Sequence, residues 1–206
     1  IGDDTFALKL NAGTLHINSN LTGISGTSVD TVSIVGGTDF VNGSVTHYLI
    51  SDSTVYSWDG TTLDGSSFSD PPERTGDFAA ITDDGTDLYL VTTTGQVFSA
   101  ESPWNEEDWT YITTVDGSVD ADYGAASVVD ISGTDHLMIG TDDGYYLMEL
   151  DGTLIESPDD YEASYPELGS ALVYQVYQTT NADEDIYLAT QNGLWKRTGP
   201  TEFERQ

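Results

Sequence analysis

The sequence contains no cysteine, which excludes disulfide cross-links and thiol chemistry. Only five of its 206 residues are Lys or Arg, and they form no basic stripe, so the chain lacks the charge that replaces phosphate counterions in nucleic-acid binding. No apolar run approaches the ~20 residues that span a bilayer, and we expect no signal peptide in this sequence. These absences predict a protein that neither binds nucleic acid nor inserts into a membrane.

Acidic residues dominate the composition instead. The chain holds 36 Asp and Glu residues and has a formal net charge of −31, whereas a small domain carries a charge of magnitude about 2–8. In dilute buffer such a charge repels itself, but at molar salt the Debye length falls to about 3 Å and the repulsion is screened. Because 37% of the residues are hydrophobic, the acidity does not indicate disorder. The pattern resembles proteins of halophiles, such as haloarchaea and their viruses.

One short pattern recurs along the chain. An apolar strand leads through a tight turn to a second apolar strand, starting near residues 48, 88, 137 and 186, with a weaker copy from residue 6. Repeats of about 40–50 residues that contain several short strands are typical of β-propeller blades. We therefore predict an all-β fold, a β-propeller of four-stranded antiparallel blades, with four full repeats, one partial repeat and five or more blades in the intact ring. The predicted repeats of this single domain cover residues 1–27, 28–75, 76–122, 123–168 and 169–206.

Each full repeat supplies the four strands of a blade. The inner strands are predicted at residues 29–35, 78–81, 125–131 and 171–177. The looser fourth strands are predicted at residues 63–68, 109–112, 154–156 and 201–203. Between the second and third strands, dipeptides such as Asp143-Gly144 and Asn192-Gly193 favour the positive φ that two-residue hairpins need. No 3.6-residue periodicity with caps is sustained, so no helix is expected.

Two of the repeats resemble those of known propellers. Residues 137–146 and 186–195 look like the repeat of regulator-type and of BNR-type, sialidase-like propellers, and residues 57–62 are similar to a degraded Asp-box. The resemblance covers nearly the whole chain and implies a fold more than a function. Sialidase-like chemistry, as the family implies it, uses clustered arginines, a Tyr nucleophile and an acid. Because Arg197 and Arg205 lie near the last blade's outer strands, far in register from Arg74, we predict no arginine triad and no catalytic residue.

Two acidic segments offer closely spaced oxygens of the kind that Ca²⁺ prefers. They are residues 120–124, with Asp120 and Asp122, and residues 83–87. Neither completes a known calcium loop with a bidentate Glu, and Asp and Gly favour turns without any metal. No cofactor is therefore predicted. Asp120 and Asp122 stay as calcium candidates, against the alternative of turn chemistry on an acidic surface.

The loops that enter the inner strands carry aromatic residues. In a propeller these loops lie on the same face as the hairpin tips, and that face is predicted to present Arg74, Tyr123, Tyr161 and Tyr165. Exposed aromatic side chains serve glycan or protein recognition, so these four residues form the predicted binding set. The alternative is that the tyrosines only cover blade edges.

The leading hypothesis is a non-enzymatic propeller for recognition or assembly. It places the domain outside the cell, with a protein or glycan partner on a cell surface or a virion spike, turret or tail. The partial first blade and the start at Ile1 favour a place in a larger oligomeric assembly. Two alternatives stay open. One is a glycan-active hydrolase of sialidase-like fold, which needs a pocket with two carboxylates of separated pKa values. The other is a ligand-sensing propeller of a receptor.

Overall fold

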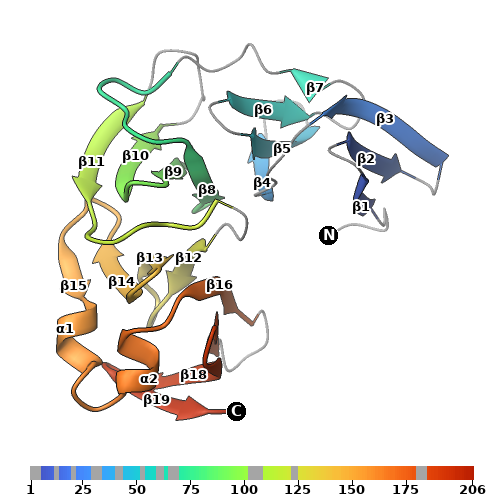
Figure 1. Ribbon diagram of the computed structural model, residues 1–206. Coiled ribbons are helices and arrows are strands. Elements are labelled where there is room, and N and C mark those ends of the chain that lie inside the picture. Colours follow the sequence, from blue (N-terminus) through green and yellow to red (C-terminus); the bar gives the residue numbers. More distant parts are fainter. Residues whose placement is uncertain are drawn as a thin grey trace.

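The computed structural model describes residues 6–11, 14–19, 22–28, 34–39, 44–51, 54–58, 63–64, 70–101, 109–121, 125–179 and 185–206. These residues form five antiparallel sheets, one with three strands and four with four strands (Figure 1). In every sheet, each strand pairs with its neighbour along the chain. The predicted all-β fold, with four full repeats and one partial repeat, is confirmed.

The first two sheets come from the N-terminal part of the chain. The first sheet consists of β1 (Phe6–Asn11), β2 (Thr14–Ser19) and β3 (Thr22–Ser28). The second sheet consists of β4 (Ile34–Asp39), β5 (Ser44–Ser51), β6 (Thr54–Trp58) and β7 (Leu63–Asp64).

Three further sheets follow in order around an arc. The third sheet consists of β8 (Phe78–Asp83), β9 (Leu88–Thr92), β10 (Gln96–Ala100) and β11 (Thr110–Thr114). The fourth consists of β12 (Ala126–Asp130), β13 (Asp135–Thr141), β14 (Gly144–Glu149) and β15 (Leu154–Glu156). The fifth consists of β16 (Val173–Gln178), β17 (Ile186–Thr190), β18 (Gly193–Gly199) and β19 (Glu202–Arg205). Strands β8, β12 and β16 lie on the inner side of the arc, as predicted for inner strands (Figure 1).

Two short helices between β15 and β16 correct the prediction that the chain has no helix. α1 spans Pro158–Tyr161 and α2 spans Pro166–Gly169. The Asp160 carboxylate accepts a hydrogen bond from the Ser157 N–H at 2.7 Å, which closes the start of α1. Each helix has four residues, too few to show a 3.6-residue pattern, so only capping residues and prolines mark them in the sequence. No helix of the described residues has the length and apolar character needed to cross a membrane.

A buried threonine stabilises the hairpin between the second and third strands of the last two sheets. The Thr141 hydroxyl donates to the Gly144 carbonyl at 3.1 Å, and the Thr190 hydroxyl donates to the Gly193 carbonyl at 2.9 Å. Both glycines have a positive φ, +87° and +124°, which a side chain would disfavour. The two predicted Gly hairpins are confirmed.

The apolar cores lie between consecutive sheets. We call the face of a sheet that meets the next sheet along the chain its forward face, and the opposite face its backward face. The core between the second and third sheets includes Ile50, Val55, Phe78, Leu90 and Phe98. The core between the third and fourth includes Tyr89, Val91, Val97, Leu137 and Ile139. The core between the fourth and fifth includes Met138, Tyr145, Ile186, Leu188 and Trp195. Each of the last four sheets thus covers an apolar face that its neighbour would otherwise expose, which is the packing principle of repeat folds.

Candidate functional site

Arg74, a member of the predicted binding set, is held by its own loop. Its guanidinium donates to both carboxylate oxygens of Asp70, at 2.7 and 3.2 Å, and to the carbonyl oxygen of Gly76. The charge also lies 4.9 Å from the ring centre of Phe78. Only 15% of the side chain is exposed. Arg74 therefore organises the loop before β8, and most of its donors already have acceptors.

Tyr161 is not the exposed aromatic residue that the sequence predicts. It is 1% exposed, because the short helix α1 turns its ring into the core between the fourth and fifth sheets. The ring stacks on that of Tyr145 with centroids 4.6 Å apart. The Tyr161 hydroxyl donates to the Tyr145 carbonyl at 2.9 Å and accepts from the Tyr145 N–H at 2.6 Å. This tyrosine joins a connecting segment to the sheet, as in the alternative in which the tyrosines cover a blade edge.

Tyr165 is half-buried beside the same core. Its ring meets the rings of Trp195 and Phe203 edge-on, at centroid distances of 6.1 and 5.4 Å. Tyr123 lies outside the described residues. The structure thus places Tyr161 and Tyr165 together in one core and Arg74 in a loop of the third sheet, so these three do not form one binding set.

A buried polar network that the sequence does not predict lies next to Tyr161. The Glu156 carboxylate accepts a hydrogen bond from the Tyr145 hydroxyl at 2.5 Å and from the Arg197 guanidinium at 2.6 Å. The side chains of Glu156 and Arg197 are only 5% and 8% exposed, so this is a buried ion pair between the fourth and fifth sheets. Arg197 Nε has no hydrogen-bond partner in the described part of the chain.

This network has a Tyr, an acid and an Arg, but its electrostatics oppose nucleophilic catalysis by the tyrosine. Burial raises the pKa of Tyr145, and the hydrogen bond to the Glu156 carboxylate raises it further. A tyrosine nucleophile needs an accessible hydroxyl and a pKa that favours ionisation. Tyr145 has 0% exposure and a raised pKa, so the network connects two sheets and does not present a reactive group.

The acidic turns hold backbone groups in place. One Asp84 carboxylate oxygen accepts hydrogen bonds from the N–H groups of Thr86 and Asp87, both at 2.7 Å. Burial raises the pKa of the neighbouring Asp83 to about 6, and the charge of Asp84 adds to this effect. Among the described residues, no group of three or more His, Asp or Glu side chains is arranged to hold a metal ion. Asp120 lies in this part of the chain, whereas Asp122 lies outside the described residues.

Three surface hollows can take a ligand or a partner side chain. A polar hollow of about 600 Å³ lies between the fourth and fifth sheets, with Asp130, Asp185, Lys196 and Arg197 in its lining. A second, of about 430 Å³, is lined by Pro72, Glu73, Gln96 and Tyr111. The third, of about 340 Å³, lies on the forward face of the fifth sheet and is lined by Gln175, Tyr177, Tyr187, Ala189 and Leu194. We call the surface formed by these five residues the terminal face.

The residues of the terminal face lie at positions whose equivalents in the third and fourth sheets are buried. Leu194 pairs with Ala189 across the hairpin, as Val97 pairs with Val91 and Tyr145 with Gly140. Val97 and Tyr145 are both 0% exposed because the next sheet packs on them, whereas Leu194 is 42% exposed.

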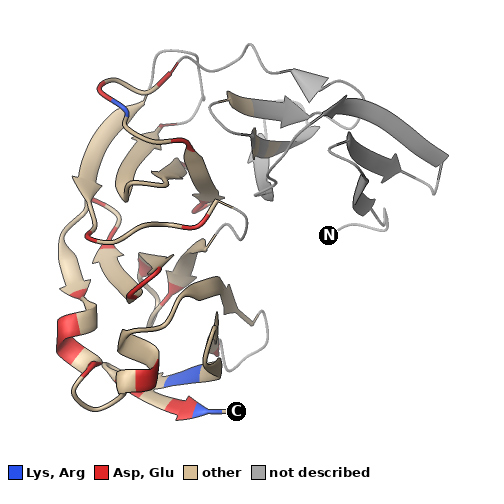
Figure 2. Cartoon of the chain, in the orientation of Figure 1, with Lys and Arg blue, Asp and Glu red and all other residues tan. Residues whose placement is uncertain are grey.

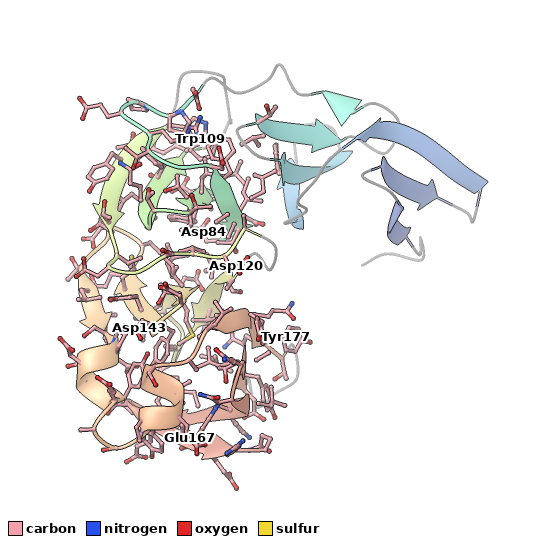
Figure 3. The ribbon with its side chains drawn as sticks, viewed as in Figure 1. Asp84, Trp109, Asp120, Asp143, Glu167 and Tyr177 are labelled. Atoms are coloured by element: carbon pink, nitrogen blue, oxygen red, sulfur yellow. The ribbon has the colours of Figure 1, made fainter. Side chains whose placement is uncertain are left out.

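The same holds for the inner strand of the fifth sheet. Tyr177 pairs with Tyr187, as Thr82 pairs with Tyr89 in the third sheet. Thr82 is 7% exposed and Tyr177 is 54% exposed, at the open side of the sheet (Figure 3). The terminal face is therefore an apolar and aromatic sheet face that no described part of the chain covers. Strand alternation in the sequence marks these residues as one face, but it does not show that the face is uncovered.

Several solved structures share this fold. No protein-family model and no curated protein matches the chain. One similar structure is the extracellular domain of a protein described as a hybrid two-component system from B. thetaiotaomicron, with a TM-score of 0.64 and 13% identity over 100% of this chain and 26% of that one. A gluconolactonase from Xanthomonas campestris has a TM-score of 0.59 and 14% identity over 94% of this chain and 67% of its own. YCF48 bound to a D1 peptide has a TM-score of 0.60 and 12% identity over 98% and 62%.

These structures are β-propellers, so the predicted resemblance to propeller repeats is confirmed at the level of the fold. The chain spans between about a quarter and two thirds of the length of these proteins. At 12–14% identity the likeness shows the architecture of the blades and no shared activity.

Proposed function

We propose that this chain is a non-enzymatic recognition domain that binds a protein partner through the terminal face. The observation that carries the proposal is the exposure of Tyr177 and Leu194, 54% and 42%, at positions that are buried in the preceding sheets. Apolar and aromatic side chains gathered around a hollow are the usual anchors of a protein interface. The peptide-bound state of YCF48 supports a protein partner, because that propeller has a similar fold.

The contacts of two polar arrangements among the described residues favour this proposal over the sialidase-like hydrolase. Glycoside hydrolysis needs two accessible carboxyl groups, one of them with a raised pKa. Burial raises the pKa of Asp83, but its oxygen accepts a hydrogen bond from the Gly85 N–H at 2.9 Å in a tight turn. The buried Tyr145 and Glu156 already bond to each other. Neither arrangement offers an acid and a nucleophile to one sugar.

We further propose that the domain acts outside the cell in concentrated salt. The net charge of −31 supports this, because such a charge is screened at high ionic strength. The similar fold of an extracellular domain from a two-component system supports an outer location. A cell-surface protein and a virion spike are the two settings that fit both the outer location and the concentrated salt. In a sensing role, the ligand would bind to the same terminal face.

The test compares two matched variants with the wild-type chain. Leu194→Glu places a charge in the terminal face, and Leu154→Glu places the same charge on β15, where Leu154 is 54% exposed. Each immobilised protein is incubated with an extract of the native host at 0.5 and 2 M NaCl, and the retained proteins are quantified. A protein partner is retained by the wild type and by Leu154→Glu and is lost from Leu194→Glu. Identical retention on all three, or turnover of glycan substrates by the wild type, refutes the proposal.

A further inference from the structure

We propose that the polar hollow between the fourth and fifth sheets binds a small uncharged polyhydroxy compound of about the size of a monosaccharide. We call this hollow the inter-sheet hollow. It is separate from the terminal face, because none of its described lining residues belongs to that face. The ligand is therefore additional to the protein partner proposed above, and it does not depend on what covers the terminal face.

The inter-sheet hollow has the dimensions of a small-molecule site. Its volume of about 600 Å³ lies within the range of about 300–1,000 Å³ that is usual for ligand pockets. The turn between β12 and β13, the start of β17 and the end of β18 line it, so two neighbouring sheets contribute. Ile131, Ile186 and Pro200 give it apolar area, and most of the other lining residues are polar. Such a mixed lining suits a ligand that has both C–H and O–H groups.

One buried donor of this lining has no acceptor. The Arg197 side chain is only 8% exposed, and its Nε–H makes no hydrogen bond to the described part of the chain. Another nitrogen of the same guanidinium donates to Glu156 at 2.6 Å. A buried donor without an acceptor is costly, and most such groups in folded proteins have a partner. Because Arg197 lines the inter-sheet hollow, a ligand oxygen that enters the hollow can supply the acceptor.

Other polar groups of the lining have unused hydrogen-bonding capacity. One carboxylate oxygen of Asp130 accepts the Gly133 N–H at 2.7 Å, while its second oxygen has no partner among the described residues. The hydroxyl groups of Ser132 and Thr198 have no partner there either. A ligand hydroxyl can accept from Arg197 and donate to Asp130, because a hydroxyl is both a donor and an acceptor. A compound with several hydroxyl groups therefore matches the groups that the hollow offers.

The cations around the inter-sheet hollow are already paired, which disfavours a charged ligand. Lys196 pairs with Asp185 at 2.7 Å and Arg197 with Glu156 at 2.6 Å, and the two cations follow each other on β18, in a blue segment of Figure 2. An anionic ligand would meet the Asp130 carboxylate, and a cationic ligand would lie beside both cations. These charges are local and partly buried, so salt screens them less than it screens the exposed surface.

The experiment uses the full chain, labelled with ¹⁵N, in 2 M NaCl. The uncharged probes are glucose, galactose and mannose, and the charged probes of similar size are glucuronate and glucosamine. Chemical-shift changes of the backbone amides locate each probe and give its dissociation constant. At least one uncharged sugar is expected to shift the amides of residues 130–133 and 196–199. Its dissociation constant is expected in about the millimolar range, as for a ligand with few atoms, and below that of both charged probes.

Two variants assign this binding to the inter-sheet hollow. Asp130→Asn is expected to raise the dissociation constant about tenfold, because a hydrogen bond to a charged group is lost, and Thr198→Val about threefold. Asp151→Asn is the matched control, because Asp151 also accepts an N–H in a turn, from Thr153 at 2.9 Å, and lies outside the hollow. It is expected to keep the wild-type affinity.

Four results overturn the inference. They are the absence of shifts at these amides with every probe, tighter binding of a charged probe than of every sugar, unchanged affinity in both Asp130→Asn and Thr198→Val, and loss of sugar binding in Leu194→Glu. The last result would place the sugar on the terminal face. In each case the retention of a protein partner by the terminal face is measured separately, so the proposed function can survive when this inference fails.

Discussion

Removing the charge of Glu156 is expected to lower the free energy of unfolding more than any other single change in the last two sheets. The carboxylate accepts hydrogen bonds from the Arg197 guanidinium at 2.6 Å and from the Tyr145 hydroxyl at 2.5 Å. The side chains of Glu156 and Arg197 are both more than nine-tenths buried. Glu156→Gln keeps the size of the side chain and leaves Arg197 buried without a counter-charge. Loss of one partner of a buried ion pair costs about 3–5 kcal/mol, so the free energy of unfolding is expected to fall by that amount.

The assay is urea unfolding at pH 7, followed by far-UV circular dichroism. The difference in midpoints, multiplied by a common slope, gives the change in the free energy of unfolding. Glu167→Gln is the matched control, because its partner Arg205 lies at a similar distance of 2.6 Å while the two side chains are 60% and 53% exposed. An exposed pair contributes at most about 1 kcal/mol, so the control is expected to stay near the wild type.

A double variant separates the charge from the shape. The double variant Glu156→Gln with Arg197→Met leaves neither charge of this pair buried. Its free energy of unfolding is expected to exceed that of Glu156→Gln alone by about 2 kcal/mol or more. The reasoning is refuted if Glu156→Gln loses less than about 1 kcal/mol, or if it loses no more than Glu167→Gln. Either result would mean that water reaches the pair and screens its charges.

Three further changes test other parts of the structure. Gly140→Ala is expected to lower the free energy of unfolding by about 1–3 kcal/mol, because a Cβ there would lie 2.6 Å from Val173 Cγ1; an unchanged urea midpoint would contradict this close packing. The pKa of Asp83 is raised by burial from 3.8 to about 6, so the folded state holds more protons between about pH 4 and 6 and its stability falls as the pH rises through that window. Asp83→Asn is therefore expected to be stabler than the wild type at pH 7 and not at pH 3.5, and equal effects at both pH values would contradict the shift. Raising NaCl from 0.1 to 1 M is expected to raise the urea midpoint of the wild type, because it screens a net charge of −31; full stability in salt-free buffer would contradict it.

The sheets could be predicted because their determinants are local. Each hairpin is marked by a turn residue next to alternating apolar residues, and Gly144 and Gly193 have the positive φ that such turns require. β15, Leu154–Glu156, has the predicted bounds, while β8 runs two residues beyond its predicted end. The two helices were not predicted because each has a single turn. At α1, the capping residue Ser157 is a weaker signal than strand alternation.

The contacts between sheets could not be predicted from local pattern. Glu156 and Arg197 are 41 residues apart, and in a chain with 36 acids nothing marks Glu156 as the one that is buried. Tyr161 is a loop aromatic residue by sequence, and only the fold of the connection back onto the sheet buries it. The exposure of Leu194 has the same origin, because alternation indicates a face but not whether another part of the protein covers it.

Two of the few cations form ion pairs between the fifth sheet and the part of the chain before it. Arg197 on β18 pairs with Glu156 of the fourth sheet, and Arg205 on β19 pairs with Glu167 on α2. Both pairs join the fifth sheet to the part of the chain before it, on the side opposite the terminal face. The third and fourth sheets are held on two faces, whereas in the described chain the fifth sheet is held on its backward face alone. Two of the five basic residues of the chain therefore lie at the interface between the fifth sheet and the part of the described chain before it.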